Sequence, residues 1–113
     1  VKQMLGQRDK VFFDAVVAYN DQVALDVIRA VEDEGLQCPE DISVTGYDDS
    51  YLAQTGKIPL TTVTHPQEKL GNMAAELLLK LIREGNGTVE ENQIQIEPEL
   101  VIRQSCVEKN NLS

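Results

Sequence analysis

Two short apolar runs flank a stretch with helical periodicity in the first half of the chain. The first run covers residues 15–19 and is followed by Asn20, and the second covers residues 42–47 and is followed by Asp48. Between them, residues 21–34 carry apolar side chains three and four positions apart, which is the spacing of a helix face and not the alternation of a strand. This order predicts a βαβ unit, with two parallel strands joined by a right-handed crossover.

Parallel strands bring the polar residues that follow the two runs to one edge of the sheet. Ligands of open α/β sheets bind at the carboxyl ends of the strands. We therefore expect Asn20 and Asp48 to face one cleft. Asn20 or Asp21 should also cap the helix, with Asp21 favoured, and Asp49 is most simply a turn residue.

A second helix is predicted over residues 66–84, after a polar loop at 49–60 and a short extended run at 60–64. Its apolar side chains repeat three and four positions apart, as on a buried face. The short strands predicted elsewhere, including extended segments at 93–97 and 99–105, are too few to cover that face. Each large apolar side chain is worth about 1.5–3 kcal/mol when buried. The chain is therefore expected to belong to a longer polypeptide or to pack against another copy.

Composition narrows the class of protein. The chain has 113 residues, 42% of them hydrophobic, and a net charge of −9, so it is one small domain or a piece of a larger one, and this segment has no basic nucleic-acid footprint. No apolar run reaches the roughly 18 residues of a membrane span, and no membrane partner is expected. Cys38 and Cys106 fit no metal-ligand spacing and are expected to be unpaired thiols in a reducing compartment. We expect neither a metal nor a cofactor.

The predicted cleft suits a polyhydroxylated ligand. An ionised Asp48 can accept hydrogen bonds from two vicinal hydroxyls, Asn20 can both donate and accept, and His65 could add a third contact. The simpler alternatives are that Asn20 only caps its helix and that His65 only precedes one.

An enzyme has little support in this sequence. No Ser or Cys lies in a nucleophile elbow, no glycine-rich phosphate loop is present, and the single His65 has no obvious nucleophile to activate. The pair Asp48–Asp49 resembles the acidic pair of phosphoacceptor receiver domains, but no strand end supplies the lysine that those domains need. We expect no catalytic residues.

Three sequence blocks resemble the effector-binding domain of LacI/GalR-type repressors. They are AVVAYNDQVALDVIRAVEDEGLQCPEDISVTGYDDS, then PLTTVTHPQEKLGNMAAELLLKLI, then EPELVIRQS, in the order and spacing of that family over residues 11–105. Within the family, the elements YND, GYDDS and HP are most similar to its arabinose-responsive branch. Members of that branch join a winged-helix DNA-binding head to a sugar-sensing body.

The resemblance implies an α/β fold, the C-terminal part of a two-subdomain periplasmic-binding-protein-like fold with parallel βαβ units. Residues 1–62 would belong to the C-terminal effector subdomain, residues 63–92 would cross as a helix of the N-terminal subdomain, residues 93–105 would return, and residues 106–113 would form a tail. Asn20 and Asp48 match the family's effector-binding positions, and His65 falls where the family has a polar cleft residue.

The resemblance further implies a cytoplasmic transcriptional repressor that binds a sugar, L-arabinose by similarity, without chemistry. Operator DNA would bind through a separate N-terminal head, and the protein would be a homodimer with Leu25, Tyr51 and Leu52 at the interface. An equally good interpretation is that those three are ordinary apolar side chains scattered over the surface. The chief alternative function is an extracytoplasmic sugar-binding protein of a transporter.

Overall fold

The structure, a computed structural model, describes residues 2–7, 12–85 and 92–109. Its elements in chain order are α1 (Lys2–Leu5), β1 (Ala15–Val17), α2 (Asp21–Asp33), β2 (Ser43–Thr45), α3 (Tyr51–Thr55), β3 (Thr62–Thr64), α4 (Gln67–Glu84) and β4 (Glu99–Val101). The chain divides into two compact units, one of residues 1–64 with 100–113 and one of residues 65–99. The assignment of these residues to two family subdomains stays a prediction.

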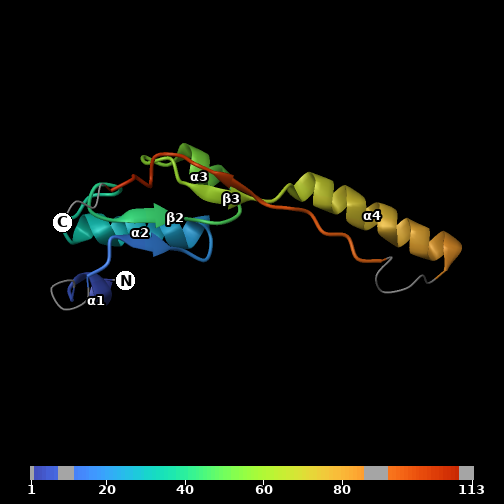
Figure 1. Ribbon diagram of the computed structural model, residues 1–113, viewed down its shortest axis with the longest axis horizontal. Coiled ribbons are helices and arrows are strands. Elements are labelled where there is room, and N and C mark those ends of the chain that lie inside the picture. The colour runs from blue at the N-terminus through green and yellow to red at the C-terminus, as the bar shows by residue number, and fades with distance from the viewer. Residues whose placement is uncertain (1, 8–11, 86–91, 110–113) are drawn as a thin grey trace. The chain divides into compact units, whose positions relative to one another are not determined.

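The first unit is built on the predicted βαβ arrangement. Strands β1 and β2 pair in parallel, with Ala15 opposite Ser43 and Val17 opposite Thr45. Helix α2 connects them and packs against β2 (Figure 1). The strands are shorter than the apolar runs that predicted them, but their order and direction are confirmed.

The core of this unit lies between α2 and β2. The sheet-facing side chains of α2 are almost fully buried, and they pack with apolar residues in or next to β2, in α3 and in the loop after α3. This core includes Ala24, Val27, Ile28, Val31, Ile42, Val44, Ala53 and Leu60. The helical periodicity of residues 21–34 therefore identified the buried face of α2, except that Val23, which belongs to the apolar stripe, is 41% exposed.

Two further segments lie beside β2. The stretch around β3 runs parallel to the end of β2, where Gly46 N–H donates to the Thr61 carbonyl at 2.9 Å. On the chain's return, Val44 N–H donates to the Ser105 carbonyl at 2.9 Å, and Val107 N–H donates to Ser43 Oγ at 3.2 Å. In the predicted tail, Cys106 and Val107 are thus hydrogen-bonded to β2, and Lys109 Nζ donates to the Asp41 carbonyl just before it. Residues 110–113 lie outside the described residues.

Two other sequence predictions were wrong. The polar loop expected at residues 49–60 contains α3, which is only five residues long and has Ser50 as its N-cap. Residues 93–97 form no strand, and the second extended segment is regular only at β4, which pairs with β3. Pro98 separates the two segments and cannot donate to a sheet, which limits the strand to the residues after it.

The second unit contains α4, which matches the predicted helix 66–84 except that Pro66 is its N-cap. Gly85 follows with a positive φ of 80°, a conformation that glycine adopts without strain. No residue of α4 is buried, and its large apolar side chains Leu70, Leu78, Leu79 and Ile82 are 48–70% exposed. Residues 86–91, the end of the predicted crossover segment, lie outside the described residues. In the part of the chain that is described, no helix is long and apolar enough to span a membrane.

Candidate functional site

The segments that carry Asn20 and Asp48 lie side by side at the carboxyl edge of the β1–β2 pair. Beyond the strands, Ala18 N–H donates to the Thr45 carbonyl at 2.9 Å, and Asp21 N–H donates to the Tyr47 carbonyl at 3.0 Å. The parallel pairing therefore continues almost to the two candidate residues. The structure brings these segments together as the βαβ pattern predicted, whereas a role in ligand binding stays a prediction.

Asn20 is the N-cap of α2. Its backbone is extended, with φ −153°, and its side-chain Oδ1 accepts a hydrogen bond from Val23 N–H at 2.9 Å. The preference for Asp21 as the cap was therefore wrong. The cap uses the amide oxygen of Asn20 and does not need its two N–H donors, so capping and ligand binding can share this side chain.

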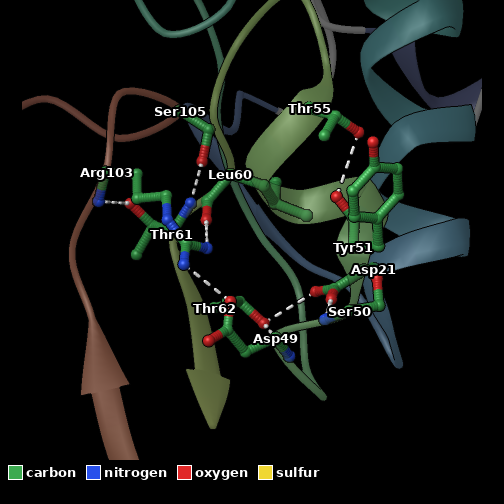
Figure 2. A network of polar contacts seen from close by, with 10 residues as sticks. All are labelled: Asp21, Asp49, Ser50, Tyr51, Thr55, Leu60, Thr61, Thr62, Arg103 and Ser105. Carbon is green, nitrogen blue, oxygen red and sulfur yellow. Dashed lines mark hydrogen bonds and ion pairs between the residues drawn. The ribbon is translucent and has the colours of Figure 1, made fainter.

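Asp21, the first residue of α2, is instead a buried structural acid. It is 2% exposed, and its two carboxylate oxygens accept from Ser50 N–H at 2.6 Å and from the Thr62 hydroxyl at 2.7 Å (Figure 2). Its position at the N-terminus of a 13-residue helix also favours a negative charge. Asp21 thus joins α2 to the segment after Asp48 and to β3.

A hollow opens beside Asp48. It has a volume of about 330 Å³ and is lined by Tyr19, Tyr47 and Asp48. Tyr19 is 86% exposed and Tyr47 is 39% exposed. A carboxylate next to two aromatic rings combines one polar group with apolar area, as small-molecule sites do. Sequence reasoning missed both tyrosines, although Tyr19 immediately precedes Asn20 and Tyr47 immediately precedes Asp48.

Asp48 and Asp49 form a turn in which both residues have positive φ, 105° and 49°. The expectation that Asp49 is a turn residue fits this geometry, but Asp49 does more. Its Oδ1 accepts from Arg103 Nη2 at 2.7 Å, and the two side chains are only 17% and 19% exposed. Arg103 was not predicted as part of the site.

His65 directly follows β3 and is the first residue of the second unit. It is half-buried and takes part in an interaction within the structure. Its role as a third sugar contact stays a prediction.

The three predicted interface residues lie on α2 and α3. Leu25 and Leu52 line a second hollow, of about 340 Å³, between these helices. Leu25 is half-buried and packs against the core, so it is not simply a surface residue, whereas Tyr51 is 77% exposed. Their role in dimerisation stays a prediction.

Both cysteines are free thiols, as expected. Cys38 is buried, and its Sγ lies 3.5 Å from the Ser105 carbonyl oxygen. Burial, with smaller contributions from Cys106 and nearby glutamates, raises the pKa of the Cys38 thiol to about 11. Within the described ranges, no group of three or more His, Cys, Asp and Glu side chains could hold a metal ion.

The sequence profile of the periplasmic binding protein-like domain family matches residues 3–106. An arabinose metabolism transcriptional repressor of Halalkalibacterium halodurans is 38% identical over 96 residues, covering 82% of this chain and 26% of the relative. The HTH-type transcriptional repressor PurR of Photobacterium profundum is 38% identical, covering 85% of this chain and 28% of the relative. The chain thus spans about a quarter of the length of these curated relatives.

A solved structure of a LacI family transcriptional regulator from Lactobacillus casei, with bound sucrose, is also similar. It matches with a TM-score of 0.76 and 37% identity, over 93% of this chain and 38% of the other. These matches confirm the resemblance to LacI/GalR-type effector domains and the α/β fold with parallel strands. The chain belongs to the periplasmic binding protein-like domain family, and its similarity within that family is to the effector domains of LacI-type regulators.

Proposed function

We propose that this chain is the sugar-sensing part of a cytoplasmic transcriptional repressor of carbohydrate-utilisation genes, with L-arabinose as its effector. The longer polypeptide that would contain it is called the full-length repressor below. The observation that carries the proposal is the hollow of about 330 Å³ beside Asp48, at the carboxyl edge of parallel strands. The 38% identity to an arabinose metabolism repressor supports the choice of sugar.

The residues at this edge have the chemistry that a pentose needs. The Asp48 carboxylate accepts hydrogen bonds from two neighbouring sugar hydroxyls. The side-chain NH2 of Asn20, which takes no part in capping α2, donates a hydrogen bond to the sugar. Tyr19 and Tyr47 offer ring faces for the C–H side of the sugar. Hydrogen bonds to a charged group contribute about 1.5–3 kcal/mol each, so a few such contacts orient a small sugar. Binding would occur without turnover.

The allosteric part of the proposal concerns the two units. Residues 1–62 and 93–105 would lie in the C-terminal effector subdomain and residues 63–92 in the N-terminal one. The division between residues 64 and 65 supports the first of these boundaries, whereas the second compact unit extends to residue 99 and not to 92. Sugar would close the subdomains and change the affinity of a separate N-terminal head for operator DNA. Such coupling is typically 1–3 kcal/mol.

The full-length repressor would act as a homodimer. The hollow between α2 and α3 carries apolar Leu25, Leu52 and Ile58 with charged Arg29 and Glu32 at the same surface. Both signs of charge on one patch allow it to pair with its own copy across a two-fold axis.

An extracytoplasmic sugar carrier is the alternative, because it shares the fold. The similarity to regulators, in sequence and in structure, favours the repressor. The complete gene separates the two: a winged-helix head upstream of this chain supports the repressor, and a lipoprotein signal supports the carrier.

Substitution of Asp48 tests the sugar site in the full-length repressor. Asp48→Asn removes the charge but keeps the shape of the side chain, and asparagine, like aspartate, tolerates the positive φ of this position. L-arabinose affinity, measured by calorimetry, should fall about tenfold or more, in line with the loss of a charged hydrogen bond of about 1.5–3 kcal/mol, with little change in melting temperature. His65→Ala should cost less.

Asp33→Asn is the matched control, because Asp33 is exposed at the opposite end of α2 from Asn20. It should leave the affinity unchanged. An Asp48→Asn protein that binds L-arabinose as tightly as the parent removes Asp48 from the site, and a larger loss from His65→Ala reverses the ranking of the contacts. Conversion of labelled L-arabinose to a product would contradict the proposal of binding without turnover and would indicate an enzyme.

A further inference from the structure

The turn that presents Asp48 is strained and must be held in place. Asp48 and Asp49 are consecutive non-glycine residues with positive φ, at 105° and 49°. Such conformations are unfavourable for residues with a Cβ and persist only where the surroundings over-determine them. They cluster at ligand sites, so the contacts that hold this turn bear on binding.

The backbone of the turn is fixed by three successive N–H groups. Asp48 N–H donates to the Val63 carbonyl at 2.9 Å, Asp49 N–H donates to Thr62 Oγ1 at 3.3 Å, and Ser50 N–H donates to the Asp21 carboxylate at 2.6 Å. The acceptors come from β3 and from the start of α2. The Thr62 hydroxyl in turn donates to Asp21, which is adjacent to Asn20, so one network supports both candidate sugar contacts.

Arg103 is the member of this network that comes from the returning chain. Its guanidinium donates to Asp49 Oδ1 at 2.7 Å and to the Leu60 carbonyl at 3.0 Å, and its backbone N–H donates to Thr61 Oγ1 at 2.9 Å (Figure 2). These contacts hold both the backbone and the guanidinium of Arg103 in place. The ion pair is sheltered, with side-chain exposures of 19% and 17%, and so lacks the solvent screening that weakens surface pairs.

We propose that Arg103 is a positioning residue for effector binding. Its ion pair with Asp49 holds the Asp48–Asp49 turn in the conformation that presents the Asp48 carboxylate at the hollow. Arg103 acts through Asp49 and does not itself touch the sugar. The segment around Arg103, where the chain re-enters the first unit, thereby sets effector affinity. This inference rests on the proposed function, in which Asp48 contacts the sugar.

The test uses a double-mutant cycle in the full-length repressor with L-arabinose as the probe. Arg103→Gln should raise the dissociation constant about tenfold, which corresponds to about 1.4 kcal/mol. In an Asp48→Asn background the same change should cost less than about twofold, because the contact that Arg103 positions has already been lost. Arg83→Gln, the same chemical change on exposed α4, should have no effect.

Asp49→Asn removes the same ion pair from the other side and leaves the return segment unaltered. It should reproduce the loss caused by Arg103→Gln, and the two changes together should cost no more than either one. Equal losses from Arg103→Gln in the parent and in the Asp48→Asn background would overturn the proposal, because a merely structural residue gives additive effects.

Hydrogen exchange without sugar keeps the inference separate from the proposed function. Arg103→Gln should speed exchange in the peptide that spans residues 46–52 and leave the rest of the chain unchanged. Unchanged exchange there, or faster exchange throughout the chain, would contradict a positioning role. If the parent protein does not bind L-arabinose, the proposed effector is wrong, and the exchange result alone decides whether Arg103 holds the turn.

Discussion

Asp21 and Asp48 carry the same chemical group in contrasting surroundings. Asp21 is 2% exposed and has both carboxylate oxygens hydrogen-bonded within the protein, whereas Asp48 is half-buried and lines a hollow. A buried acid whose acceptors are filled serves the fold. The hollow and its two aromatic rings are the reason for proposing that Asp48 contacts a ligand. The sequence assigned Asp48 to a ligand cleft and Asp21 to the helix cap, but its spacing did not predict that Asn20 is the cap and that Asp21 is buried.

The two cysteines should differ in reactivity in the folded protein. Cys38 is buried and its pKa is raised to about 11, so at pH 8 it remains a neutral thiol, which is not the nucleophilic form. Cys106 is half-buried and should be alkylated first. Mass spectrometry after a timed exposure to iodoacetamide at pH 8 measures the order. Equal labelling of the two in the native protein, with urea-unfolded protein as the control, would mean that Cys38 is not protected as the structure shows.

At the scale of elements, periodicity predicted what repeats over enough residues. The stripe on α2 and the two apolar runs predicted the βαβ unit, and the stripe on α4 predicted the long helix. Helix α3 was missed because five residues are little more than one turn and cannot show a period. The Asp49–Arg103 pair was missed for another reason, since its members are 54 residues apart and only the folded chain brings them together.

The close approach of β2 to the start of α2 depends on Gly46. A Cβ at this position would collide with Asp21 Oδ1 and with Leu60 Cδ2. Gly46→Ala should therefore destabilise the protein by about 1–3 kcal/mol, the usual cost of overpacking. Chemical denaturation of the full-length repressor measures the free energy of unfolding.

Gly56→Ala is the matched control for that measurement. Gly56 has an ordinary φ of −67°, and a Cβ there would make only van der Waals contacts of 3.5–3.7 Å. It should change stability by much less than Gly46→Ala. Comparable losses at the two glycines would show that the cost comes from removing a glycine and not from crowding at Asp21.

At the scale of the whole chain, the two units differ in how well they bury their apolar residues. The first unit encloses a core around α2, β2 and Leu60, while no residue of α4 in the second is buried. An apolar face that large normally marks an interaction surface. The expectation that the chain belongs to a longer polypeptide or packs against another copy follows from this face, and it makes a prediction about the isolated chain.

The 113-residue chain on its own should self-associate through α4. Leu78→Gln with Ile82→Gln, one turn apart on an exposed apolar face, should lower the mean mass measured by light scattering. Lys80→Gln, on another side of the same helix, should leave the mass unchanged. A parent chain that is monomeric at the highest concentration tested would contradict the need for a cover on α4.

Any association that persists in the Leu78→Gln, Ile82→Gln chain should use the hollow between α2 and α3. Leu52 is 41% exposed at that hollow, so Leu52→Glu places a charge where the proposed dimer buries an apolar side chain, which is costly without a partner. Sedimentation should then show dimers in the double variant and monomers once Leu52→Glu is added. Val23→Glu, the same kind of change at an apolar side chain of α2 that is also 41% exposed but does not line the hollow, is the control, and it should retain the dimer. If Leu52→Glu leaves the dimer intact, the copies pair through a different surface, and Leu25 and Tyr51 lose their proposed role with it.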